Sequence, residues 1–181
     1  RFIPSKDAFN FILNHYPESS TINEAKIWLE KTNLRLEYFD TAIGNLVKLI
    51  KTNALSPEEL HEATSTLAQA YILVEENQQA IPPLRTAIQT ASDSEIRGRS
   101  LFIKGQLFTL LGEKDSAATS FDEVIALKRK SPRRYMIHSK LEKLRLDGLQ
   151  NISWEAAKYG LQELEDNREN RPFLDFIFYD H

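Results

Sequence analysis

The stretch GQLFTLLGEKDSAATSFDEV, residues 105–124, decides the fold class of this chain. Its glycines, lysine and serine suggest a phosphate-binding loop, which requires the order G-x-x-x-x-G-K-[ST] between a strand and a helix. Here six mostly apolar residues separate Gly105 from Gly112, and Glu113 occupies the place of the lysine. No β-branched strand precedes the stretch, so we reject a phosphate loop.

The same stretch fits two short helices folded against each other. Gly105 and Phe108 are spaced for one face of a helix, and Ala117 and Phe121 repeat that spacing after the polar break GEKD. We therefore expect a helical hairpin in which the small residues Gly105 and Ala117 let the two helix backbones approach closely.

The pattern of this hairpin recurs along the chain. With Ala117 as the anchor, equivalent alanines are Ala80, Ala42 and Ala157, at successive spacings of 37, 38 and 40 residues. Four positions after each anchor stands a large apolar residue: Leu46, Leu84, Phe121 or Leu161. A repeat of about this length predicts an α-solenoid.

These residues resemble the tetratricopeptide repeat. The segment LAQAY (67–71) followed by Ala80, Leu84 and Ala87 has its order of small, aromatic and large residues. The resemblance implies an all-α fold, an α-solenoid of tetratricopeptide-like helical hairpins wound as a right-handed superhelix. A fold of this kind does not by itself identify a function.

The repeat register predicts one tetratricopeptide-like array over residues 1–181. We expect the second helix of an incomplete repeat at 5–17, repeats at 21–54, 57–92, 95–130 and 132–169, and the start of a truncated repeat at 171–181.

Three helix starts carry recognisable signals. Thr21 with Glu24, and Ser56 with Glu59, have the spacing of capping boxes. Ser131 followed by Pro132 marks the third start. If Asn77 caps the helix that contains the pair 82–83 (PP), the prolines lie near its first turn, where few amide hydrogen bonds are lost, and we expect a local distortion there and no more.

Composition excludes several classes of protein. The chain of 181 residues has 41% apolar residues and no cysteine, which excludes disulfides, thiol catalysis and cysteine-ligated metal. No run of eighteen apolar residues is present. The first residue is not methionine and no signal pattern follows it, so we expect that targeting segments were removed.

The formal net charge of −3 conceals a basic segment. Residues 128–145 contain eight basic and one acidic side chain. This segment is either an anion-binding patch or, as we favour, a helix end and a solvated face. We expect no nucleic acid partner, because Tyr135 is the one stacking aromatic within the segment.

The sequence offers no catalytic constellation, metal motif or cofactor motif. The histidines are far apart, and the acidic first turn at 58–62 suits the helix dipole. Trp28 and Trp154 are expected to pack between helices. We therefore predict no catalytic residue, metal or cofactor, whereas a helical enzyme domain would require a pocket with clustered titratable groups.

Repeat arrays of this type bind proteins in the groove formed by the first helix of each pair. The residues that the register places on this groove are Glu24, Lys31, Arg35, Glu62, Gln69, Arg99 and Gln106. Either they bind a partner or they only solvate the inner surface. The basic side chains among them favour a partner that is acidic or offers carbonyl groups.

Three longer stretches resemble the SprE/PorW proteins of Bacteroidetes, which are tetratricopeptide lipoproteins of type IX secretion and gliding motility. They are HYPESSTINEAKIWLEKTNLRLEYFDTAIGNL (15–46), EIRGRSLFIKGQLFTLLGEKDSAATSF (95–121) and NRPFLDFIFYDH (170–181). The resemblance implies a periplasmic protein, anchored to the outer membrane by a lipid outside this fragment, whose partners are secretion-machinery components.

Another tetratricopeptide adaptor remains an alternative, either an outer-membrane assembly factor or a cytoplasmic regulatory module. An upstream lipoprotein signal that ends in cysteine would favour the secretion component.

Overall fold

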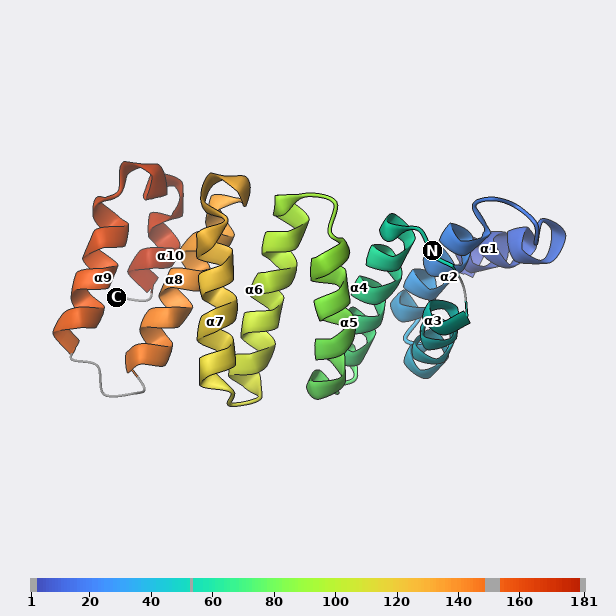
Figure 1. Cartoon of the computed structure of the whole chain (residues 1–181), viewed down its shortest axis with the longest axis horizontal. Coiled ribbons are helices and arrows are strands. Elements are labelled where there is room, and N and C mark those ends of the chain that lie inside the picture. The colour runs from blue at the N-terminus through green and yellow to red at the C-terminus, as the bar shows by residue number, and fades with distance from the viewer. Residues whose placement is uncertain (1–2, 53, 149–153, 180–181) are drawn as a thin grey trace. The chain divides into compact units, whose positions relative to one another are not determined.

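A computed structural model describes residues 3–52, 54–148 and 154–179, and all of its regular elements there are helices (Figure 1). The elements are α1 (Ile3–His15), α2 (Ile22–Arg35), α3 (Phe39–Thr52), α4 (Pro57–Leu73), α5 (Asn77–Thr90), α6 (Ser94–Leu110), α7 (Lys114–Ala126), η1 (Lys128–Lys130), α8 (Arg133–Gly148), α9 (Trp154–Asp166), η2 (Arg168–Phe173) and α10 (Leu174–Tyr179). Within these ranges no helix is long and apolar enough to cross a membrane.

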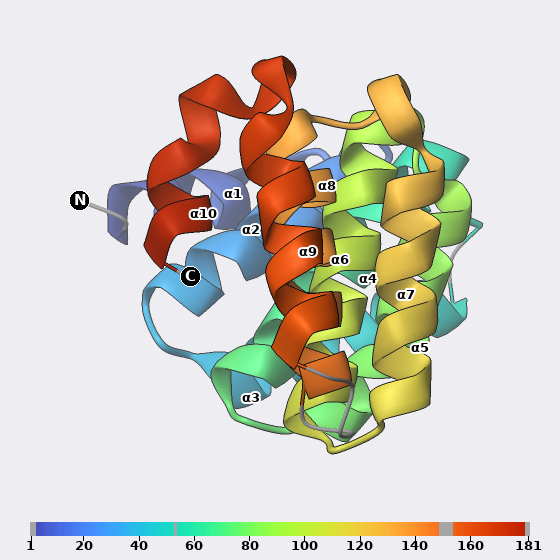
Figure 2. The same ribbon diagram turned by 90° about the vertical axis from the view of Figure 1, so that its left-hand side faces the viewer.

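Consecutive helices form hairpins, which confirms the all-α solenoid class. The pairs are α2–α3, α4–α5, α6–α7 and α8–α9 (Figure 1). They form two compact units, an N-terminal unit (Arg1–Ser92) and a C-terminal unit (Asp93–His181). In the C-terminal unit α6 to α9 pack each against the next (Figure 2). The right-handed superhelix stays a prediction, as does the division into repeats.

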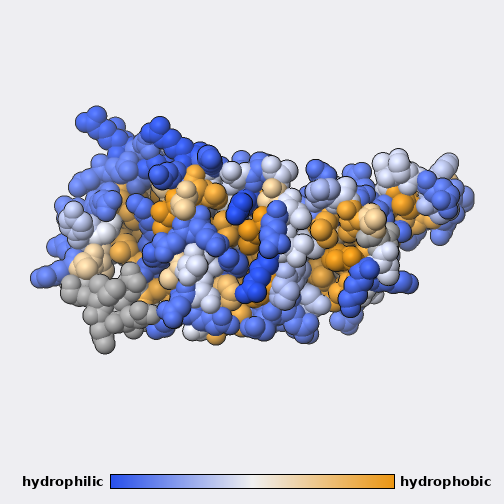
Figure 3. Space-filling view, in the orientation of Figure 1, coloured by the Kyte–Doolittle hydropathy of each residue, from blue (hydrophilic) through white to orange (hydrophobic). Residues whose placement is uncertain are grey.

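Three of the four alanine anchors are fully buried, whereas Ala157 is only partly buried. Ala42 and Ala80 in the N-terminal unit and Ala117 in the C-terminal unit have no exposed surface. The core beside Ala42 contains Ile27, Leu46 and the partly buried Ile43, among others. Apolar side chains also gather at the surface over α2, α3 and α4 (Figure 3).

Gly105 is a point of close approach, but its neighbour differs from the expected one. A Cβ atom at Gly105 would lie 2.4 to 2.8 Å from three ring carbons of Phe121. The close contact is therefore between Gly105 and the ring of Phe121, one turn after Ala117, because this fully buried ring fills the space in front of the glycine.

The three hairpin turns α2–α3, α4–α5 and α6–α7 share one backbone conformation. Tyr38, Glu76 and Glu113 each donate their N–H over 2.9 Å to the carbonyl five residues earlier. The residues before them, 37, 75 and 112, have φ of 63°, 61° and 76°. This is the Schellman arrangement at a helix C-terminus, in which a left-handed residue ends the helix.

The two expected capping boxes have different outcomes. At Ser56 the box is present, since Glu59 N–H donates to Ser56 Oγ (3.2 Å) and Ser56 N–H donates to the Glu59 carboxylate (2.8 Å). At Thr21 the prediction is wrong, because no side-chain cap bond forms. The backbone of Thr21 is not extended, unlike that of Ser56, and its hydroxyl lies 3.1 Å from Ser19 Oγ.

Asn77 does not cap its helix, so the condition for placing the two prolines near the first turn is not met. Glu76 is the N-cap residue of α5 and makes no side-chain cap bond, while Asn77 is the first helical residue. Pro82 and Pro83 therefore lie beyond the first turn, inside the helix. Each proline lacks the N–H that a helical residue donates to the preceding turn.

Candidate protein-binding groove

One face of α2 carries most of the predicted groove residues of the N-terminal unit. Glu24, Trp28, Lys31 and Arg35 follow one another at spacings of four, three and four residues, which places them on one helix face. Glu24, Trp28 and Arg35 are exposed, and Lys31 is half-buried. A partner can therefore reach this face.

A cavity of about 660 Å³ lies beside this face, between α1, α2 and α4, and we refer to it as the groove cavity. Phe9 and Ala8 of α1 contribute apolar surface to it, Trp28 and Arg35 come from α2, and Gln69 comes from α4. The cavity thus combines aromatic surface with cationic and amide groups, the mixture typical of sites that bind side chains of a partner.

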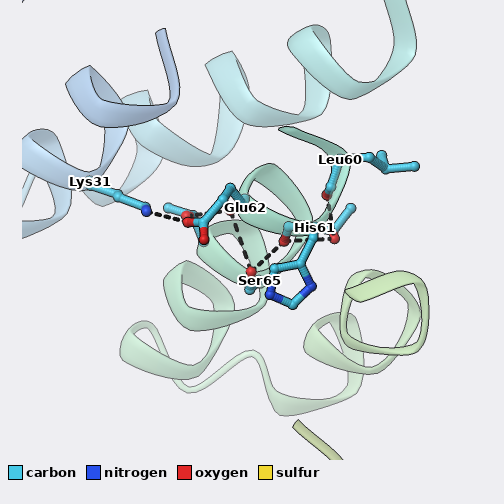
Figure 4. A network of polar contacts seen from close by, with 7 residues as sticks. Lys31, Leu60, His61, Glu62 and Ser65 are labelled. Atoms are coloured by element: carbon cyan, nitrogen blue, oxygen red, sulfur yellow. Dashed lines mark hydrogen bonds and ion pairs between the residues drawn. The ribbon is translucent and has the colours of Figure 1, made fainter. Parts of the chain in front are cut away.

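Trp28 and Lys31 form the polar edge of the groove cavity. Lys31 Nζ lies 4.3 Å from the centre of the Trp28 ring. It also forms an ion pair with Glu62 of α4 (Figure 4). The ring remains 47% exposed. The ammonium is therefore held by a cation–π contact and a carboxylate at once, and it links α2 to α4.

The α4 side of the groove is held by hydrogen bonds behind Glu62 (Figure 4). His61 is buried, and its Nδ1 lies 2.9 Å from the carbonyl oxygen of Ala87 in α5. The Ser65 hydroxyl donates to the carbonyl of His61. These contacts stay within the α4–α5 hairpin and fix the helix that carries Glu62 and Gln69.

The structure brings together only some of the predicted groove residues. Lys31, Arg35 and Gln69 line the groove cavity, and Glu62 contacts it through Lys31. Glu24 is exposed on the same face of α2 but does not line the cavity. Arg99 and Gln106 are exposed on α6 in the C-terminal unit. A binding role for all seven residues stays a prediction.

Trp28 is among the groove residues that sequence reasoning missed, together with Ala8 and Phe9 of α1. Trp28 was expected to pack between helices, but almost half of its surface is exposed and it lines the groove cavity. Its position between Glu24 and Lys31 on one helix face was the available signal. The side chain of Trp154 lies outside the described residues.

The basic segment 128–145 forms several intramolecular ion pairs. Arg129 and Arg133 both contact Glu169, and Arg133 Nε also donates over 2.8 Å to Asn170 Oδ1. Lys143 forms an ion pair with Asp122. These contacts hold η2 and α7 to the segment and pair several of its cations with carboxylates of the chain itself. The interpretation of the segment as a helix end and a solvated face stays a prediction.

Burial raises the pKa of the Glu30 carboxyl above its ordinary value. Desolvation outweighs the opposing effect of hydrogen bonds that Asn33 Nδ2 (2.8 Å) and Asn45 Nδ2 (2.9 Å) donate to the carboxylate, and of the charge of Lys6. Glu30 does not line the groove cavity. Among the described residues no group of three or more His, Cys, Asp or Glu side chains is arranged to hold a metal ion.

No family model and no curated protein matches this sequence. Among solved structures, one of MamA has a TM-score of 0.71 and 22% identity, over 95% of this chain and 92% of that chain. A tetratricopeptide repeat protein from Parabacteroides merdae has a TM-score of 0.67 and 15% identity, over 99% of this chain and 68% of that chain. TTC0263, a tetratricopeptide protein of Thermus thermophilus, has a TM-score of 0.57 and 20% identity, over 99% of this chain and 89% of that chain.

At these identities the similarity shows the fold. The chain has the tetratricopeptide-type fold.

Proposed function

We propose that this chain is a non-enzymatic scaffold that binds a segment of another protein in the groove cavity of its N-terminal unit. The observation that carries the proposal is the exposed Trp28 ring, which lines a cavity of about 660 Å³ together with Arg35 and Gln69. Exposed aromatic and arginine side chains in concave sites are the residue types that dominate binding energies at protein interfaces.

We further propose that the partners are components of the type IX secretion and gliding machinery. This step rests on the resemblance of residues 15–46, 95–121 and 170–181 to the SprE/PorW proteins. In this proposal the protein is periplasmic and is anchored at the outer membrane by a lipid outside the fragment. Another tetratricopeptide adaptor, with the same groove and other partners, is the alternative.

Affinity capture from a Bacteroidetes envelope extract tests both steps. The test variant combines Trp28→Ala and Arg35→Glu, two exposed groove side chains. The matched control combines Tyr159→Ala and Arg85→Glu, an exposed aromatic and an exposed cation on the second helices α9 and α5. Both should fold, since exposed substitutions rarely cost much stability.

We expect the groove variant to lose the captured proteins and the control to keep them. Equal capture by both variants contradicts the groove assignment. Capture that depends on the groove but contains no secretion component contradicts the type IX proposal and leaves the scaffold function standing.

A further inference from the structure

Of the two cations among the described residues that line the groove cavity, Lys31 forms an ion pair with a carboxylate of the protein itself. Lys31 Nζ contacts the Glu62 carboxylate from the neighbouring first helix, and the two side chains are 28% and 50% exposed. In Figure 4 the Lys31 side chain extends toward Glu62. The pair lies where solvent and a partner can both reach it.

This ion pair is easily exchanged. A partly exposed pair contributes little to stability, because water solvates both charges after separation. The Trp28 ring, 4.3 Å from Lys31 Nζ, attracts the ammonium by a cation–π contact that does not depend on Glu62 for its geometry. Replacing the Glu62 carboxylate by another carboxylate therefore leaves Lys31 in place.

The surroundings of Lys31 suit an external carboxylate with an apolar neighbour. Arg35, one helical turn further along α2, lines the same cavity and is exposed. Phe9, Trp28 and Leu34 give the cavity aromatic and aliphatic surface. A segment that places an acidic side chain beside a large apolar one complements both the charge and the apolar surface.

Building on the proposed function, we infer that the groove binds an acidic segment of another protein and that Glu62 occupies the place of its carboxylate in the free protein. In the complex, the partner's carboxylate displaces Glu62 from Lys31 and also faces Arg35, while a neighbouring apolar or aromatic side chain enters the cavity. Glu62 is thus a built-in competitor. Removal of the Glu62 carboxylate should therefore tighten binding, whereas removal of a polar groove residue that contacts the partner would weaken it.

The test starts with short random peptides displayed on phage and selected on the whole chain. Peptides that are enriched are synthesised, and their affinities are measured for the wild type, Glu62→Gln, Lys31→Gln and Glu123→Gln. The last variant is the control, because Glu123 is a similarly exposed carboxylate (48%) that forms an interhelical ion pair with Lys104 (2.9 Å) within the α6–α7 hairpin of the C-terminal unit. Circular dichroism checks that each variant is folded.

We expect enriched peptides that carry a carboxylate next to a large apolar residue. Glu62→Gln should bind them about two- to fivefold more tightly, as the loss of a partly exposed competing ion pair implies. Lys31→Gln should weaken binding about tenfold, and Glu123→Gln should not change it.

Three results would overturn the inference: enrichment of basic or neutral peptides, failure to enrich any peptide, or equal or weaker binding by Glu62→Gln. None of these decides the proposed function, which stands or falls with groove-dependent capture of proteins from the extract. If capture depends on Trp28 and Arg35 but Glu62→Gln does not tighten peptide binding, the groove is correct and the competitor role is wrong.

Discussion

At Gly105, a single missing methyl group makes room for the ring of Phe121 in the core of the C-terminal unit. We expect Gly105→Ala to destabilise the protein by about 1–3 kcal/mol, because the added Cβ would lie within 2.8 Å of ring carbons that are fully buried and cannot easily move. Denaturant unfolding measures the free energy of unfolding of the variant and the wild type. An unchanged m-value shows that the difference between them is a difference in stability.

The matched control for this substitution is Gly44→Ala in α3. A Cβ at Gly44 meets nothing within 4 Å, so alanine there should stabilise the helix by about 0.5–1 kcal/mol. If both substitutions changed the free energy of unfolding equally, packing against Phe121 would not explain the glycine at 105.

Glu30 should make stability depend on pH. Because burial raises its pKa in the folded protein, the folded state retains the proton to higher pH than the unfolded chain does. Its contribution to stability is present below the ordinary carboxyl pKa and is lost as the pH rises through the raised folded pKa. Glu30→Gln removes this loss, so the difference in unfolding free energy between variant and wild type should grow with pH and then level off.

Chemical denaturation at a series of pH values measures this difference, with Glu24→Gln as the control. Glu24 is exposed on the same helix as Glu30. The difference in unfolding free energy between Glu30→Gln and the wild type could instead stay constant across the acidic range or shrink as the pH rises. Either result would show that desolvation does not raise the pKa of the Glu30 carboxyl.

At the scale of elements, the hairpin turns show what a sequence reveals and what it hides. Gly112 marks the α6–α7 turn in the sequence, but Glu37 and Glu75 adopt the same left-handed conformation without any glycine signal. Packing of each hairpin imposes this conformation on whichever residue is present. Local preference likewise failed at Thr21, where the backbone is not in the extended conformation of a typical N-cap.

The two glutamates at positive φ carry a cost that glycine avoids. We expect Glu37→Gly and Glu75→Gly each to stabilise the N-terminal unit by about 0.5–1 kcal/mol, since relief of the left-handed strain exceeds the added flexibility of the unfolded chain. Gly112→Ala should have the opposite sign. Thermal unfolding measures all three, and destabilisation by both glycine substitutions would mean that the glutamate side chains have another structural role.

Across the whole chain, spacing predicted the fold well and the site in part. The recurrence of Ala42, Ala80 and Ala117 predicted the hairpins because helix pairs pack closely only where side chains are small. The register placed Glu24, Lys31 and Arg35 on the groove face and therefore placed Trp28 there too, but tryptophan's preference for burial led us to expect it between helices. The register could not show that Glu62 crosses to Lys31, because that contact depends on how α4 packs against α2.

Site-specific photo-crosslinking from the groove tests the central claim most directly. A photoreactive amino acid replaces Gln69, which is exposed and lines the groove cavity, or, as the control, Gln78, which is exposed in the first turn of α5. After irradiation in native envelope extract, position 69 should crosslink to a discrete partner protein, and position 78 should not. Crosslinking of the same protein from 78 but not from 69, or no crosslink from 69 at all, would contradict the groove as the binding site.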